Sequence, residues 1–347
     1  MRGVLILVFY GALSWLYPLP LFAHHSFATH YDANRPMELR GTVVEFSMRS
    51  PHSFLHLEVE SESGEPVRWE IEMASVPLLR RQGFSADTFK LGDQVSVNVW
   101  LNRVENNRLV WGRGFVTAEG ETLGAFPPTP RVESVHLAAS SAERLQGRWR
   151  GVPVPTFDGN GSPLPLNPAG LVAVRTYDPQ DSPANACEPN NVPATYHSPY
   201  QVEIRIEGNE ATIQHELYNV TRTIYLDSEP QRAEPTGVFG LATGRIEEDE
   251  LVIKSAGFTA SGWGLGTASD ELGIGTDIPS SERKKLLERF SVSDDGQTLT
   301  VDYTLEDPAY LTQPYVGRVA LNRVADNEPL HPYECELDSA ERFSRDP

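Results

Sequence analysis

Polar and apolar residues alternate along much of this 347-residue chain with the period of a β-strand. In the segment 66–73 every second residue from Val67 onward is apolar, and the residues between them are charged. The segments 95–101 and 202–206 show the same alternation. Because successive side chains of a strand point to opposite faces of a sheet, this pattern predicts strands that are half buried. The chain is therefore expected to fold mostly as β-structure.

The first part of the chain has the element order of a small barrel. Ser75, Pro77 and Gly83 fit the N-cap, first turn and C-terminal cap of a short helix. The predicted strands around that helix are 41–48, 53–60, 66–73, 95–101 and 109–117. Three strands, a helix and two strands is the order of an OB-fold, a five-stranded and partly open barrel. We therefore expect an OB-fold-like domain over residues 24–118.

A second β-rich region follows a proline-rich segment. Residues 119–146 lose the alternation, contain a cluster of prolines and predict a linker. Between residues 147 and 336 the alternation returns in about eight or nine antiparallel strands, a number that fits a closed up-and-down barrel or a sandwich. The segment 262–275 is rich in glycine and serine and predicts a long mobile loop. Residues 337–347 are expected to form a tail.

Residues 1–23 have the features of a signal peptide. Arg2 is their only charged residue, a long apolar run follows, and Ala23 supplies the small residue that signal peptidase requires. Cleavage after Ala28 is an alternative. A single membrane-spanning anchor is the other interpretation, since the run is about long enough to span a bilayer, but two prolines at its exit favour cleavage. We expect a periplasmic or secreted protein with no membrane anchor after cleavage.

The cysteines and the charge fit an exported protein. Cys187 and Cys335 are the only two cysteines, and in an oxidising compartment they predict one disulfide. The formal net charge is −19, which argues against nucleic acid and against an anionic membrane surface as partners.

Histidines gather close to the predicted mature N-terminus. A free His24 would offer its amine and its ring nitrogen to one metal ion, and His52 would add a second imidazole. His25 or His56 would be an auxiliary ligand, and His56 shares the less apolar face of its predicted strand with His52. Such a nitrogen-rich site suits copper or zinc. The alternative is that these are solvated surface histidines.

The sequence favours no class of enzyme. It contains no Gly-x-Ser-x-Gly elbow, Walker loop, HExxH motif or dinucleotide-binding fingerprint. An enzyme of unknown class built on the second barrel is therefore a less favoured alternative to a binding protein. A barrel interior lined by carboxylates would indicate chemistry, and an apolar interior would indicate carriage of a ligand.

Several short motifs resemble those of a family of uncharacterised exported bacterial proteins. They are His24-His25-Ser26-Phe27, the segment 39–43, Pro51-His52 and Leu91-Gly92-Asp93, together with several segments of the second half. Ser50 departs from the family pattern, which has asparagine before Pro-His. The resemblance implies a two-domain exported architecture and no established activity.

A second resemblance concerns the lipocalin barrels. Gly147-Arg148-Trp149 is similar to the Gly-x-Trp motif that opens the first strand of a lipocalin, and the resemblance implies that Arg318 on the last strand stacks on Trp149. Together with the strand count of a closed barrel and a Gly-rich loop able to act as a lid, this motif predicts a small apolar ligand inside the second barrel. The candidate ligand-binding residues are Trp149, Arg318 and Trp263. Ligand binding there is the favoured function, and copper or zinc binding by the N-terminal histidines is the alternative.

Overall fold

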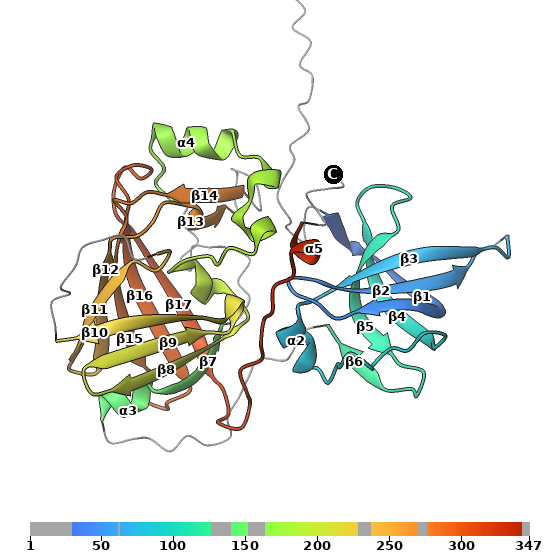
Figure 1. The fold of residues 1–347 in the computed structure, drawn as a ribbon, viewed down its shortest axis with the longest axis horizontal. Coiled ribbons are helices and arrows are strands. Elements are labelled where there is room, and N and C mark those ends of the chain that lie inside the picture. The colour runs from blue at the N-terminus through green and yellow to red at the C-terminus, as the bar shows by residue number, and fades with distance from the viewer. Residues whose placement is uncertain are drawn as a thin grey trace, which may run out of the picture.

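The computed structural model describes residues 30–61, 63–125, 140–151, 164–227, 237–268 and 276–341. These residues form two β-structures that lie side by side (Figure 1). The predicted signal peptide, His24, His25 and half of the predicted linker lie outside the described residues. Within the described ranges, no helix has the length and apolar character needed to cross a membrane.

The N-terminal β-structure has the strand connections of an OB-fold. Its elements are β1 (Tyr31–Ser47), β2 (Ser53–Glu60), β3 (Pro66–Met73), α2 (Val76–Arg80), β4 (Gln94–Asn102), β5 (Leu109–Val116) and β6 (Thr122–Gly124). The sheet order is β3-β2-β1-β4-β5-β6, and a further parallel pairing of β3 with β5 closes the first five strands into a barrel. The predicted order of strands and helix is confirmed. We call this unit the N-terminal barrel.

The alternation seen in the sequence builds the core of the N-terminal barrel. Apolar residues of one strand parity are fully buried inside, among them Leu55, Leu57, Ile71, Val97, Val99 and Phe115. Gly83 ends the α2 turn with a φ of +90°, a conformation that favours glycine because it has no Cβ.

The C-terminal β-structure is a closed barrel of nine strands. In order around the barrel they are β10 (Val220–Leu226), β11 (Leu241–Glu247), β12 (Glu250–Ala256), β15 (Lys285–Val292), β16 (Thr298–Glu306), β17 (Tyr315–Arg323), β7 (Gly147–Gly151), β8 (Gln201–Glu207) and β9 (Glu210–His215). The prediction of a closed barrel is confirmed, and the sandwich alternative is wrong. We call this unit the C-terminal barrel.

One strand pair departs from the expected antiparallel meander. Strands β10 and β11 run parallel, with Ile224 opposite Ala242 and Leu226 opposite Gly244. Every other neighbouring pair of the barrel is antiparallel. Two parallel neighbouring strands require a connection that returns along the length of the barrel. The alternation of polar and apolar residues within a strand does not indicate whether the strand runs parallel or antiparallel to its neighbour.

Short elements cover the two ends of the C-terminal barrel. Helix α3 (Ser141–Leu145) lies at one end, while α4 (Pro168–Arg175) and the antiparallel pair β13 (Ser261–Ala268) and β14 (Thr276–Ser280) lie at the other (Figure 1). The prediction of a mobile loop over 262–275 is therefore wrong for residues 262–268. Lys284 explains their order, because its ammonium donates a 2.6 Å hydrogen bond to the carbonyl of Gly264.

The chain after β17 passes between the two barrels and ends in α5 (Leu337–Ala340) beside the N-terminal barrel (Figure 1). Residues 337–340, expected to belong to a tail, are thus a folded element. Cys335 in this segment forms the predicted disulfide with Cys187.

A buried ion-pair network joins the two barrels. Arg81, which follows α2 and whose side chain is 3% exposed, pairs with Glu216 and lies 2.8 Å from Glu328. Glu328 also pairs with Arg150 at 2.9 Å. A buried charge is tolerated where opposite charges and hydrogen bonds surround it. The relative position of the barrels is therefore fixed by specific contacts.

Candidate functional site around His52 and Glu72

A carboxylate is buried on the outer face of the N-terminal barrel. The alternation of β3 places Glu72 on the polar side of the strand with Arg68, yet Glu72 is 0% exposed while Arg68 is exposed. Trp111 of β5 lies opposite Glu72 in the parallel β3–β5 pair, and Tyr31 at the start of β1 reaches over it. Both aromatic residues are themselves buried. Glu72 is therefore enclosed by side chains from distant parts of the chain.

Two side chains contact the Glu72 carboxylate directly. The Tyr31 hydroxyl donates a hydrogen bond to Oε2, and Nδ1 of His52 lies 2.8 Å from Oε1. A buried carboxylate is costly unless such donors replace its lost hydration. Glu72 is thus held in one orientation by a phenol and an imidazole.

The contact with Glu72 also determines how His52 presents its ring. Nδ1 faces the carboxylate, and a proton on Nδ1 would leave the lone pair on Nε2. The His52 side chain is 25% exposed, whereas that of Glu72 is 0% exposed. The pair therefore combines a buried carboxylate, that of Glu72, with an imidazole, that of His52, which is partly accessible to solvent. Such a ring can bind a metal ion or accept a proton as a general base.

A second histidine and two aromatic rings complete this site. The ring centroid of His30 lies 6.2 Å from that of Tyr31, and the indole of Trp111 lies 5.9 Å from Tyr31 and 6.5 Å from His52. Burial lowers the pKa of His30, and the negative charge of Glu72 opposes that effect. Burial therefore favours the neutral His30 ring, the form in which imidazole binds metals. We call Tyr31, His30, His52, Glu72 and Trp111 the His52–Glu72 site.

His56 does not join this site. Its Nδ1 accepts a 3.1 Å hydrogen bond from Nε of Arg68, which also pairs with Glu45. Four residues of extended chain separate it from His52 by about 13 Å. His56 belongs to β2, whereas His52 lies just before that strand, and the two histidines lie in different surroundings.

His24 and His25 lie outside the described residues, so their predicted role as ligands stays a prediction. Within the part of the chain that the structure describes, no group of three or more His, Cys, Asp or Glu side chains is arranged to hold a metal ion. A complete metal site would need a donor from elsewhere.

The three predicted ligand-binding residues of the C-terminal barrel lie apart. Trp149 is fully buried near α3, where its indole donates a 2.9 Å hydrogen bond to the carbonyl of Leu145. Trp263 belongs to β13 at the other end, with its ring 6.3 Å from that of Tyr218. Arg318 lies on the outside and pairs with Asp302 at 2.6 Å.

The predicted stacking of Arg318 on Trp149 is therefore wrong, although an arginine does cover that tryptophan. The guanidinium of Arg323 lies 4.0 Å from the centre of the Trp149 ring. Arg323 is directly opposite Trp149 in the β17–β7 pair, whereas Arg318 has the outward parity of β17. Arg318 and Arg323 have opposite parity on β17, so their side chains lie on opposite faces of the strand. This explains why Arg323, and not Arg318, covers Trp149.

An ion pair inside the C-terminal barrel was not predicted from the sequence. Arg222 and Glu288 are 2% and 0% exposed, and they bind each other through both guanidinium NH groups. Tyr196 donates a 3.1 Å hydrogen bond to Glu288, and Ser255 accepts one of 2.7 Å from Arg222. The interior therefore combines an apolar core with one charge-balanced cluster. The sequence pattern could have indicated this pair, because both charged residues have the same parity as the buried apolar residues of their strands.

A groove lies on the outside of the C-terminal barrel. It crosses β11, β12, β15 and β16 and has a cavity volume of about 410 Å³. Its lining includes the apolar Leu241 and Leu287 and the cationic Lys254 and Lys285. None of the predicted ligand-binding residues lines it.

Comparison with known proteins relates the first part of the chain to a family. Residues 17–109 match the model of a family of unknown function (DUF6152). The matched segment contains Tyr31, His52 and Glu72 and ends before Trp111. No curated protein matches the chain.

Proposed function

We propose that this protein is exported and binds a transition-metal ion, copper or zinc, at the His52–Glu72 site. The observation that carries the proposal is the 2.8 Å contact between Nδ1 of His52 and the buried Glu72 carboxylate. Histidines that bind metals commonly donate their other ring N–H to a carboxylate, which fixes the ring and makes the free nitrogen more basic. Imidazole nitrogen suits both copper and zinc.

The remaining ligands are proposed to come from the residues just before β1. The ring centroid of His30 lies 6.2 Å from that of Tyr31, whose hydroxyl binds the same carboxylate as His52. If the signal peptide is removed after Ala23, the amine and ring of His24 start six residues earlier, a span of up to roughly 20 Å in an extended chain. In this proposal His24 completes the site, because its amine would add a nitrogen that no internal histidine has.

Calorimetric titration of the full exported protein with Zn(II) and Cu(II) tests this proposal, after intact mass has established the first residue. We expect His52→Ala to abolish tight binding and Glu72→Gln to weaken it by about 10- to 100-fold, the usual effect of losing such a carboxylate. His56→Ala is the matched control, since it removes a nearby imidazole that lies outside the site, and it should leave the affinity unchanged. A one-residue extension before His24 should weaken binding. Equal affinity in wild type and His52→Ala would refute the proposal.

A second candidate function is carriage of a small apolar ligand by the C-terminal barrel. The groove of about 410 Å³ supports it, because ligand pockets usually measure about 300–1,000 Å³. Leu241 and Leu287 offer an apolar floor. Lys254 and Lys285, with Glu306 as the single carboxylate of the lining, leave the groove one positive charge for a ligand with an anionic head. The proposed site is thus the outer groove rather than the surroundings of Trp149.

Displacement of a fluorescent apolar probe by a fatty acid tests this second function. Leu287→Glu should remove probe binding, whereas Val316→Glu, on an exposed position of the same barrel, should not. Equal probe binding by wild type and Leu287→Glu would exclude the groove as the site.

A further inference from the structure

The loop that carries His52 is held by the C-terminal end of the chain. This loop, residues 48–52, connects β1 to β2. The amide of Glu336 donates a 2.8 Å hydrogen bond to the carbonyl of Ser50, and the Glu336 carboxylate lies 3.3 Å from the Arg49 guanidinium. Residues 324–340, here called the C-terminal strap, therefore continue across the barrel boundary into the N-terminal barrel.

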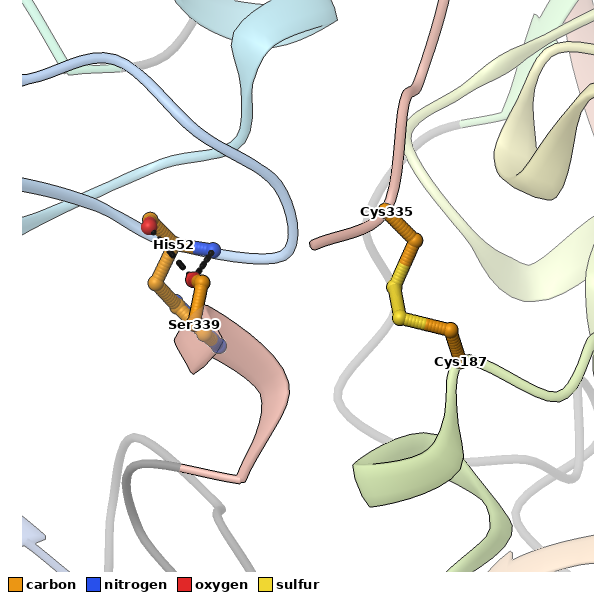
Figure 2. Close-up of a disulfide and its surroundings, with 4 residues drawn as sticks. All are labelled: His52, Cys187, Cys335 and Ser339. Atoms are coloured by element: carbon orange, nitrogen blue, oxygen red, sulfur yellow. Dashed lines mark hydrogen bonds between the residues drawn. A yellow bond between two sulfur atoms is a disulfide. The ribbon is translucent and has the colours of Figure 1, made fainter. Parts of the chain in front are cut away.

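Ser339 of the strap binds the backbone of His52 on both sides. Its hydroxyl donates a 2.8 Å hydrogen bond to the carbonyl of His52 and accepts one of 3.3 Å from the His52 amide (Figure 2). Ser339 is only 3% exposed, so water competes little for these bonds. One side chain of α5 thus fixes the backbone of the residue whose ring faces Glu72.

The strap is anchored in the C-terminal barrel immediately before these contacts. Cys335 is bonded to Cys187 (Figure 2). Tyr333 is 2% exposed, its amide donates a 3.1 Å hydrogen bond to Asn219, and its ring lies 4.9 Å from that of Tyr218. Only three residues separate Cys335 from Ser339. The disulfide therefore leaves the Ser339 end of the strap little freedom to move away from His52.

We propose that Ser339 is a positioning residue of the His52–Glu72 site, and that the disulfide-anchored strap makes the affinity of this site depend on the C-terminal barrel. The proposal rests on the proposed metal-binding function. A metal site requires its ligands within about 0.5 Å of the productive geometry, and residues that orient a ligand are part of the site even when they never touch the ion. The two hydrogen bonds that Ser339 makes with His52 are to its backbone amide and carbonyl.

Two measurements on the full mature protein test this role. The first is Zn(II) affinity by calorimetry, and the second is the NMR resonance of the His52 Nδ1 proton in the metal-free protein, which reports the contact with Glu72. Ser339→Ala should weaken Zn(II) binding about tenfold, at the low end for residues that orient a ligand, and should shift or broaden the proton resonance. Ser339→Thr, which keeps the hydroxyl, should restore both. The double variant Cys187→Ser/Cys335→Ser should resemble Ser339→Ala.

Leu337→Ala is the control, because Leu337 lies on the same short helix with 54% exposure and should change neither readout. If the wild type binds no Zn(II) while Ser339→Ala still moves the His52 resonance, the metal function fails and the positioning role stands. If Zn(II) binds but neither Ser339→Ala nor the cysteine double variant changes affinity or resonance, the positioning role is overturned. Rescue by threonine separates loss of the hydroxyl from general loss of folding.

Discussion

Acid should destabilise the C-terminal barrel through His215. This residue is 1% exposed and lies between the rings of Tyr196 and Phe239, with centroid distances of 5.6 Å and 5.4 Å. Burial, with a smaller contribution from the charge of Arg222, lowers the pKa of His215 to about 3. In the unfolded chain the ring titrates near 6.5. The unfolded state therefore binds one more proton than the folded state between these two values.

The sign and size of the effect follow from this difference. Stability is unaffected by His215 above pH 6.5 and falls as the pH decreases below it, because protons then favour the unfolded chain. Each pH unit in this window costs about 1.4 kcal/mol, so moving from pH 7.5 to 4.5 should remove about 2–3 kcal/mol of unfolding free energy through this one ring. That is a large part of the 5–15 kcal/mol that is typical of a folded domain.

Urea unfolding of wild type and His215→Phe at pH 7.5 and 4.5 measures this contribution. Phenylalanine keeps a ring between Tyr196 and Phe239 but cannot bind a proton. The variant should therefore lose about 2–3 kcal/mol less than the wild type between the two pH values. Carboxylates that titrate in the same range act in both proteins and cancel in the comparison. An equal loss in both, within about 0.5 kcal/mol, the usual limit for independent effects, would refute the reasoning.

Two further predictions concern buried charges. Arg222→Met should destabilise the C-terminal barrel by about 3–5 kcal/mol, because it leaves Glu288 buried without its cation, and Arg222→Met/Glu288→Leu should recover most of that loss. Denaturant unfolding of both variants measures this difference. A double variant as unstable as Arg222→Met would contradict the prediction. Arg323→Ala should lower the unfolding free energy by about 1–2 kcal/mol because it uncovers Trp149 and removes a desolvated cation–π contact, whereas Arg318→Ala should cost less than about 1 kcal/mol as a surface ion pair. The reverse order of the two variants in thermal unfolding would contradict this prediction.

The fold could be predicted from strand periodicity because most strands of this protein bury one face. The period of two and the single helix after β3 were sufficient for the OB-fold order. The same periodicity could also have indicated that Arg222 and Glu288 are buried, since both residues have the parity of the buried apolar residues in their strands. The parallel direction of β11 was not accessible, because strand direction depends on the connection rather than on the strand.

The candidate site could be predicted only in part. His52 was identified from residue type and position, but Glu72 has the parity of a solvated face and its burial depends on Tyr31, 41 residues earlier in the chain. Ser339 lies in a helix of four residues, too short for any period to be seen. Both were missed because their environment is made by contacts between segments far apart in sequence.

The site is assembled from segments that reach beyond the part of the chain that matches a family. Tyr31, His52 and Glu72 lie within residues 17–109. Closure of the N-terminal barrel needs the pairing of Glu70–Glu72 with Leu109–Trp111, and the His52 backbone needs Ser339. A fragment ending at residue 109 would lack Trp111 over Glu72 and both strap contacts with His52. The matched segment therefore supplies Tyr31, His52 and Glu72, while the rest of the chain supplies Trp111 beside Glu72 and the Ser339 hydroxyl that binds the His52 backbone.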